Sequence, residues 1–198
     1  MTPLFQLIFQ YKHLLLIVFT GIITSNTWAS KYDHPDDQLR ALLVEAISDA
    51  DSFEDRFDAE VWLTDMSSRL QKTMPDPLDR LELLKNVHYE ASRANLQPEL
   101  ILAVIHVESR FNRWAISRVG AQGLMQIMPF WLKEIGRPDD NLFDLKTNLR
   151  FGCTILSYYL KKENGNLVRA LGRYNGSLGS FRYPDLVFSA LRRRWYVR

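Results

Sequence analysis

Cysteine is almost missing from this sequence, since Cys153 is the only one among 198 residues. A single thiol can form no disulfide within the chain, and it cannot build a cysteine-based metal site. Because Cys153 lies in an apolar helical pattern, we expect it to be buried and chemically inert. No motif indicates a metal ion or a cofactor, and we predict neither.

Charge of one sign is also scarce. The formal net charge is +2 at neutral pH, which is too small to indicate nucleic acid as a partner. Apolar residues make up 46% of the chain and charged residues 24%. These proportions are typical of a globular protein, and they exclude a disordered or membrane-embedded chain.

Long hydrophobic runs are absent as well. An apolar stretch extends only from Leu14 to Ile23, whereas a membrane-spanning helix needs about 20 residues. Lys12 precedes this stretch, and a short polar segment ending at Ala29 follows it. This layout predicts a secretory signal peptide cleaved near Ala29, and therefore an exported, periplasmic protein. A leader retained as an anchor is the alternative.

Strand signals are few after this leader, and apolar residues recur at helical spacing instead. Pro75 and Pro77 interrupt the pattern, which predicts Asp76 as an N-cap and Pro77 at the first position of a helix. An apolar stripe is expected on the preceding helix, formed by Phe57, Val61, Trp62, Met66 and Leu70. The expected helices cover 39–47, 57–70, 77–94, 99–110, 129–138, 148–162 and 167–174, with a last one from 184.

The predicted fold class is therefore mainly α. We expect three segments, namely the leader at 1–29, an N-terminal helical extension at 30–75 and a main domain at 76–198. Composition alone sets the boundary at Pro75, and the last two segments are also compatible with one globule.

Glu108 stands out because it falls on an apolar helical stripe. The stripe consists of Ile101, Val104, Ile105 and Glu108, spaced i, i+3, i+4 and i+7. Desolvation there and the negative end of the helix dipole both raise the pKa of a glutamic acid. A carboxylic acid that is protonated near neutral pH can supply the proton that glycosidic-bond cleavage requires. The alternative is a surface Glu108 paired with Arg110 or Arg113.

Three ordered blocks lie between about residues 80 and 180. They are Glu108-Ser109-x-Phe111-Asn112, then Ser117-x-x-Gly120-Ala121-x-Gly123-Leu124-Met125-Gln126-Ile127-Met128-Pro129, then Ala170-Leu171-x-x-Tyr174-Asn175-Gly176. Together they resemble the signature of the soluble lytic transglycosylase family, whose fold is related to goose-type lysozyme. The resemblance implies a lysozyme-like helical domain at 76–198.

The resemblance also implies an activity, namely cleavage of the β-1,4 bond between N-acetylmuramic acid and N-acetylglucosamine in peptidoglycan, with formation of 1,6-anhydro ends. The family's single catalytic carboxylate maps to Glu108. Its substrate-contacting positions map to Ser117, Gln126, Met128, Tyr174 and Asn175. Arg113 and Arg173 depart from the family pattern, which often has Pro and Ala there, and they leave the substrate preference open.

Two other functions remain as alternatives, a hydrolysing goose-type lysozyme and a non-catalytic glycan-binding or envelope-assembly module. A two-carboxylate hydrolase would need a second carboxylate about 5–5.5 Å from the first if it retains the anomeric configuration, and about 6.5–9.5 Å away if it inverts it. Asp144 is the candidate for that role. The expected partner is the peptidoglycan glycan strand, and a peripheral envelope or secretion-apparatus protein is a further candidate.

Overall fold

The computed structural model of this chain describes residues 55–196. Its helices are α2 (Arg56–Leu70), α3 (Pro77–Arg93), α4 (Pro98–Glu108), α5 (Phe130–Ile135), α6 (Leu145–Lys162), α7 (Leu167–Tyr174), α8 (Arg182–Ala190) and the π-helical turn η1 (Leu191–Trp195). Within this range only isolated β-bridges occur, and no strand. The predicted mainly helical class is therefore confirmed. The predicted leader at 1–29 and the predicted helix at 39–47 lie outside the described residues.

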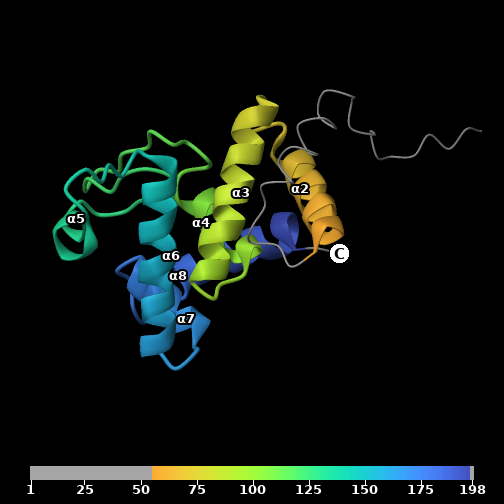
Figure 1. Ribbon diagram of the computed structural model, residues 1–198. Coiled ribbons are helices and arrows are strands. Elements are labelled where there is room, and N and C mark those ends of the chain that lie inside the picture. The colour runs from red at the N-terminus through yellow and green to blue at the C-terminus, as the bar shows by residue number, and fades with distance from the viewer. Residues whose placement is uncertain (1–54, 197–198) are drawn as a thin grey trace, which may run out of the picture. The chain divides into compact units, whose positions relative to one another are not determined.

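Helix α4 lies in the hydrophobic core, and its place among the other helices can be followed in Figure 1. Every residue from Leu100 to Ile105 has a relative exposure of 5% or less, and α3, α8 and η1 all pack against this helix. A helix that is apolar on all sides is stable only when neighbours enclose it. The burial of α4 is what brings its last residue, Glu108, close to the interior.

The start of α3 follows the sequence prediction. Asp76 is the N-cap, its carboxylate accepts hydrogen bonds from the backbone of the first turn, and Pro77 opens the helix. The Arg80 side chain, only 4% exposed, donates to Ser67 of α2 and to the carbonyl oxygens of residues 74 and 75. These bonds satisfy the turn's carbonyl groups, so they fasten α2 to α3.

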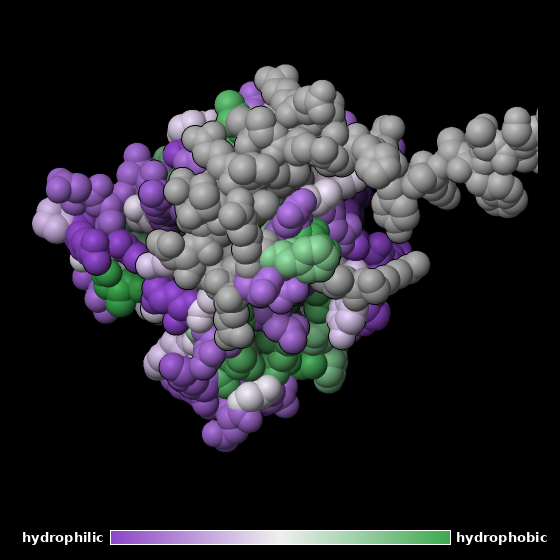
Figure 2. Space-filling model, turned by 45° about the vertical axis from the view of Figure 1, so that its right-hand side comes forward, coloured by the Kyte–Doolittle hydropathy of each residue, from purple (hydrophilic) through white to green (hydrophobic). Residues whose placement is uncertain are grey.

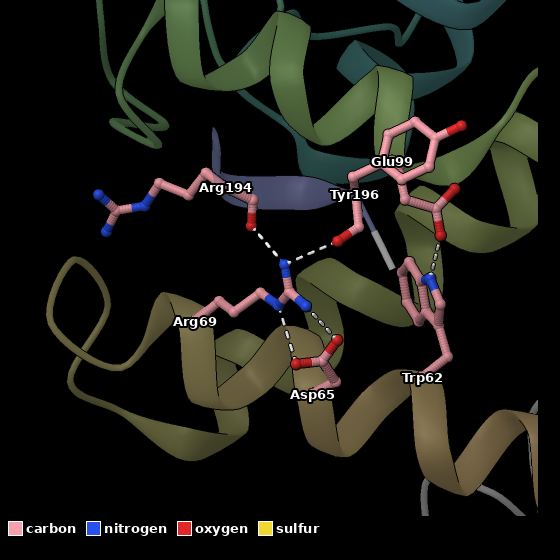
Figure 3. Close-up of polar contacts among 6 residues, drawn as sticks. All are labelled: Trp62, Asp65, Arg69, Glu99, Arg194 and Tyr196. Carbon is pink, nitrogen blue, oxygen red and sulfur yellow. Dashed lines mark hydrogen bonds and ion pairs between the residues drawn. The ribbon is translucent and has the colours of Figure 1, made fainter. Parts of the chain in front are cut away.

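Polar contacts also join α2 to distant parts of the chain. Figure 3 shows Trp62, Asp65, Arg69, Glu99, Arg194 and Tyr196. The Arg69 guanidinium binds the Asp65 carboxylate and donates to the carbonyl oxygens of Arg194, at 2.7 Å, and Tyr196, at 3.2 Å. The Trp62 indole N–H donates to Glu99 at 2.6 Å. Residues from the predicted extension thus contact the helices that follow Pro75, and the boundary itself stays a prediction.

The predicted apolar face of α2 is partly wrong. Phe57 and Val61 are 71% and 50% exposed, whereas Met66 and Leu70 are fully buried as predicted. The face that packs inward also includes Ala59 and Leu63, so it follows the spacing i, i+4, i+7, i+11 from residue 59. The buried face thus includes the small Ala59, while the larger Phe57 lies exposed at the helix start. Side-chain size alone did not identify the buried face.

Several helix ends differ from the predicted ones by a few residues. Helix α4 ends at Glu108 because Arg110 and Phe111 have positive φ angles of 51° and 67°, which no α-helix contains. Helix α5 ends before Gly136, and α6 begins three residues earlier than expected because Asp144 caps it. Helix α8 begins at Arg182, so its proline lies in the first turn, where no N–H is needed.

The interior is apolar, as the composition suggests. Cys153 is fully buried there, and burial raises the pKa of its thiol, in agreement with the prediction of an inert cysteine. On the face shown in Figure 2, hydrophilic residues predominate among the coloured atoms, and hydrophobic ones gather in smaller areas. Between residues 55 and 196, no helix is long and apolar enough to cross a membrane.

Candidate active site

Glu108 is the last residue of α4 and is partly buried. Its Oε1 accepts a hydrogen bond of 2.6 Å from the hydroxyl of Tyr183 on α8. Tyr183 is only 6% exposed. A carboxyl group is thus held at the junction of α4 and α8 by one short bond.

The surroundings of Glu108 change its acidity. Burial raises the pKa of Glu108 from 4.5 to about 7, against the smaller, opposing effect of the Tyr183 hydrogen bond. No charged group among the described residues contributes to this shift. The alternative of a surface Glu108 paired with Arg110 or Arg113 is therefore not what the structure has. Desolvation leaves a substantial fraction of the acid protonated at neutral pH.

An aromatic cluster fixes the chain reversal that follows Glu108. Phe111 packs between His106 and Trp195, with ring centroids 6.1 Å and 5.4 Å away, and the His106 and Trp195 rings are 5.9 Å apart. The left-handed conformation of Phe111 costs about 1–2 kcal/mol. Burial of its ring, which is 8% exposed, offsets that cost. The reversal directs the chain into the loop at 110–128.

This loop is stabilised by its own backbone. The Ser117 N–H donates to the Ala121 carbonyl oxygen at 2.9 Å, and the Ala121 N–H donates to the Ser117 hydroxyl oxygen at 3.0 Å. Gln122 pairs with Ile127 in both directions at 2.9 Å. Ser117 is partly exposed, so its hydroxyl lies at the loop surface while it holds the turn.

Gln126 also acts within the loop. Its φ angle is +53°, and its side-chain amide N–H groups donate to the carbonyl oxygens of Ala115, at 3.1 Å, and Gly123, at 2.9 Å. Both of these bonds use the amide nitrogen. The amide oxygen is therefore the atom of Gln126 that can accept a bond from a ligand.

Asn148 on α6 anchors the loop at 110–128 through side-chain hydrogen bonds. Its side chain is 1% exposed; it accepts from the Met125 N–H at 2.8 Å and donates to the carbonyl oxygens of Gln122 and Leu142. The loop packs so closely that a Cβ at Gly123, whose φ is +78°, would collide with Asn148 and Leu142. Sequence reasoning missed Asn148, because nothing in its local pattern distinguishes it from a surface asparagine.

Tyr174, at the end of α7, is brought to the same place. Its hydroxyl donates to the carbonyl oxygen of Met125 at 2.7 Å. Burial raises the pKa of Tyr174 and of Tyr183 well above the ordinary value, and the charge of Glu108 raises both further. Glu108 therefore lies near both tyrosines. Tyr183 was missed by sequence reasoning, since a tyrosine before a proline in a last helix carries no recognisable signal.

Two predicted positions are less closely engaged. Asn175 is exposed as the C-cap of α7, and its side-chain oxygen accepts a bond from the Ser177 hydroxyl. Met128 is partly exposed, and its carbonyl oxygen accepts from the Trp131 N–H. Neither contacts Glu108 through a hydrogen bond in the described part of the chain. Both are placed at the surface, where a ligand can reach them.

The two arginines that depart from the family pattern are held by partners. Arg113 donates through Nε to the Phe143 carbonyl at 2.7 Å and is 3.7 Å from Asp144. Arg173 is paired with Glu163. Their charges are thus partly compensated inside the protein. Among residues 55–196, no group of three or more His, Cys, Asp or Glu side chains is arranged to hold a metal ion.

Known proteins with similar sequences include two named membrane-bound lytic murein transglycosylase C, from Yersinia pestis (strain Pestoides F) and Yersinia pseudotuberculosis serotype O:1b (strain IP 31758). Each is 34% identical over 125 residues, which is 54% of this chain and 35% of the relative. The chain thus spans about a third of the length of these relatives.

Solved structures show weaker similarity. An inactive mutant of the lytic transglycosylase Slt from Pseudomonas aeruginosa is 22% identical, with a TM-score of 0.45 over 80% of this chain and 34% of that one. The 70 kDa soluble lytic transglycosylase from Escherichia coli is 20% identical, with a TM-score of 0.43 over 79% and 32%. Similarity this distant adds nothing to the description of the site.

The family model described as the transglycosylase SLT domain matches residues 85–184, half of the chain. This range contains Glu108, the loop at 110–128, Tyr174 and Tyr183. The chain belongs to the transglycosylase SLT domain family.

Proposed function

We propose that this protein is a lytic transglycosylase that cleaves the β-1,4 bond between N-acetylmuramic acid and N-acetylglucosamine in peptidoglycan, with Glu108 as its acid and base. One observation carries the proposal: a desolvated carboxyl group whose pKa is about 7, held by Tyr183 beside a loop rich in hydrogen-bonding groups. Such an acid is present in both protonated and ionised forms near neutral pH, so it can both donate and accept a proton.

The reaction we propose needs no protein nucleophile. Glu108 protonates the glycosidic oxygen as the bond breaks, and the acetamido oxygen of the muramic residue attacks its anomeric carbon, which gives an oxazolinium-like intermediate. The Glu108 carboxylate then takes the proton from the muramic 6-hydroxyl. The 6-oxygen attacks the same carbon and displaces the acetamido oxygen, which restores the acetamido group and closes a 1,6-anhydro ring. Substrate-assisted enzymes of this kind are exceptions to the two-carboxylate rule.

The electrostatics of the site favour this reaction over hydrolysis by a pair of carboxylates. A second carboxylate close to Glu108 would raise the pKa of Glu108 by repulsion, and no such contribution is present among the described residues. Asp144, the candidate for that role, caps α6 by accepting from the Thr147 N–H and lies near Arg113. Asp140 is bound to Arg150 at 2.5 Å. Both carboxylates are committed to other partners.

The residues around Glu108 take distinct proposed roles. Tyr183 positions the carboxyl group and stabilises its ionised form. Tyr174 holds the Met125 backbone and, with it, the loop that faces the acid. Ser117 and Gln126 offer hydroxyl and amide groups to sugar hydroxyls and acetamido groups. Met128 and Asn175, also proposed as substrate-binding residues, lie at the surface.

We further propose that the protein works in the cell envelope, in keeping with the names of its membrane-bound relatives. Export through the leader at 1–29 would deliver it to the periplasm, where peptidoglycan lies. A peripheral envelope or secretion-apparatus protein stays a proposed partner.

Mass spectrometry of the products from purified sacculi tests the proposal. We expect the wild-type chain to release muropeptides with 1,6-anhydro ends, and we expect the Glu108→Gln variant to release almost none while it still binds the sacculi. Reducing ends in place of anhydro ends would identify a lysozyme. Binding without release by the wild-type chain would identify a glycan-binding module.

A further inference from the structure

Trp114 is a large aromatic residue with most of its surface in solvent. It is 66% exposed, and it lies on the loop at 110–128. An indole ring presents a flat apolar face, and leaving it in water forgoes the stabilisation that burial would bring. This ring is not part of the hydrophobic core, and the proposed chemistry of Glu108 does not use it.

The orientation of the ring is fixed although it is exposed. The backbone N–H of Trp114 donates to the side-chain oxygen of Asn112 at 3.0 Å, so the backbone is held in a tight turn. The Arg113 guanidinium lies 5.4 Å from the indole centroid, and the Phe143 ring lies 5.8 Å away at an interplanar angle of 35°. Arg113 is itself tied to the Phe143 carbonyl. A ring held in this way loses little conformational entropy when it binds a ligand.

The backbone of Trp114 is also continuous with the loop that carries the proposed substrate-binding groups. The carbonyl oxygen of Ala115, the next residue, accepts bonds from the Gly123 N–H at 2.9 Å and from the Gln126 side chain at 3.1 Å. Ser117 follows two residues later and closes the same loop. Trp114 is thus connected, through a short and rigid stretch of backbone, to the two side chains proposed to bind the glycan.

We propose that Trp114, held by Arg113 and Phe143, is a stacking platform for a sugar ring of the glycan strand, at a subsite next to Ser117 and Gln126. This inference rests on the proposed function. One face of a pyranose ring consists largely of C–H groups, and it packs on an indole as another apolar surface would. Arg113, whose side chain is 41% exposed, has further N–H donors for the hydroxyl groups at the edge of that sugar.

A binding titration of the full chain carrying Glu108→Gln tests the platform without cleavage. The ligands are N-acetylglucosamine oligomers of increasing length and solubilised glycan strands, measured by isothermal titration calorimetry. Adding Trp114→Ala should weaken binding of the longer ligands roughly tenfold, as expected for one aromatic contact. Binding of the shortest ligands should change less.

Tyr158 on α6 provides a matched control. It is 52% exposed, and the Lys162 ammonium lies 5.6 Å from its ring centroid, so it is also an exposed ring beside a cation. Tyr158→Ala should leave glycan binding unchanged. Trp114→Leu keeps an apolar side chain but removes the flat ring, and it should bind as weakly as Trp114→Ala.

The outcomes separate the platform from the proposed function. If the Glu108→Gln chain binds glycan and Trp114→Ala binds it equally well, the platform is wrong and the proposed function stands. If the Glu108→Gln chain binds no glycan at all, both are wrong. Ile116 and Val119 are also exposed on this loop, and a Trp114→Ala variant that loses binding only to lipid vesicles would identify a membrane contact instead.

In the chain that retains Glu108, the platform predicts an effect on KM alone. A sugar bound equally well in the ground state and the transition state changes KM and leaves kcat unaltered. Trp114→Ala should therefore raise KM for glycan strands by roughly tenfold, with kcat unchanged. A fall in kcat at constant KM would place Trp114 in the chemistry rather than in strand binding, and would overturn the inference.

Discussion

Replacing Glu108 with glutamine removes a carboxyl group whose ionisation the folded chain disfavours. The pKa of Glu108 is raised by burial from 4.5 to about 7, and each tenfold change in acid dissociation corresponds to about 1.4 kcal/mol. In the unfolded chain the same group ionises as an ordinary glutamate. Ionised Glu108 therefore costs the native state about 3 kcal/mol relative to the unfolded state, at any pH well above 7.

The size of the effect depends on pH. Below about pH 4 the group is protonated in both states, and the cost is absent. Between about pH 4.5 and pH 7 the unfolded chain ionises while the folded chain keeps the proton, so stability falls across this range and stays lower at higher pH. The Glu108→Gln variant has no proton to lose, and the carbonyl oxygen of its new amide side chain can still accept the Tyr183 hydrogen bond. The free energy of unfolding of the variant should therefore equal that of the wild-type chain at acid pH and exceed it by about 3 kcal/mol at alkaline pH.

Thermal unfolding measured by scanning calorimetry across this pH range tests the prediction. A difference of about 3 kcal/mol raises the midpoint by roughly 6–12 °C for a chain of this size. The control is the Glu82→Gln variant, since Glu82 is an exposed glutamate on α3. Both variants lose one glutamate, so a difference between them reports the burial of Glu108. If the Glu108→Gln and wild-type curves stay parallel at all pH values, Glu108 is not desolvated and its role as an acid loses its physical basis.

Three further predictions follow from the same contacts. Tyr183→Phe removes the donor that stabilises ionised Glu108, so the pH above which glycan release declines should rise by about one unit; an unchanged pH–rate profile would contradict this. Gly123→Ala should lower the free energy of unfolding, measured in urea, by several kcal/mol, because the new Cβ would collide with its neighbours. Gly120→Ala is the control: its Cβ meets nothing within 4 Å, so it should lose only about 1–2 kcal/mol, the cost of a left-handed backbone. Cys153 should react with a thiol reagent only as fast as the chain unfolds, and rapid labelling of the native protein would refute its burial.

Much of the helical structure follows from local sequence. The bounds predicted for α7, 167 to 174, are those of the structure, and the capping of α3 by Asp76 is confirmed. These features depend on residues two to four positions apart, whose contacts form whenever the helix forms. Helix ends were predicted less well than helix positions. For example, α6, capped by Asp144, begins three residues before the start that the apolar pattern indicates.

Residues that act across the fold were not predictable in this way. Tyr183 lies 75 positions after Glu108, yet its hydroxyl reaches the carboxylate. Asn148 reaches the loop 23 positions earlier. On α2, the helical spacing places Phe57 on the apolar face, yet Phe57 is exposed in the structure. For Tyr183 and Asn148 a partner far along the chain decides where the side chain binds, and local periodicity contains no information about that partner.

By itself, the sequence determined the helical class, the family blocks and the choice of Glu108 as the candidate acid, because these depend on residue types and short spacings. Only the tertiary structure decided how strongly that acid is desolvated, which tyrosine binds it and which carboxylates are occupied elsewhere. The reason is physical: the pKa of a carboxyl group depends on the water it has lost, and water is excluded by the packing of α4, α7 and α8 together rather than by any one of them.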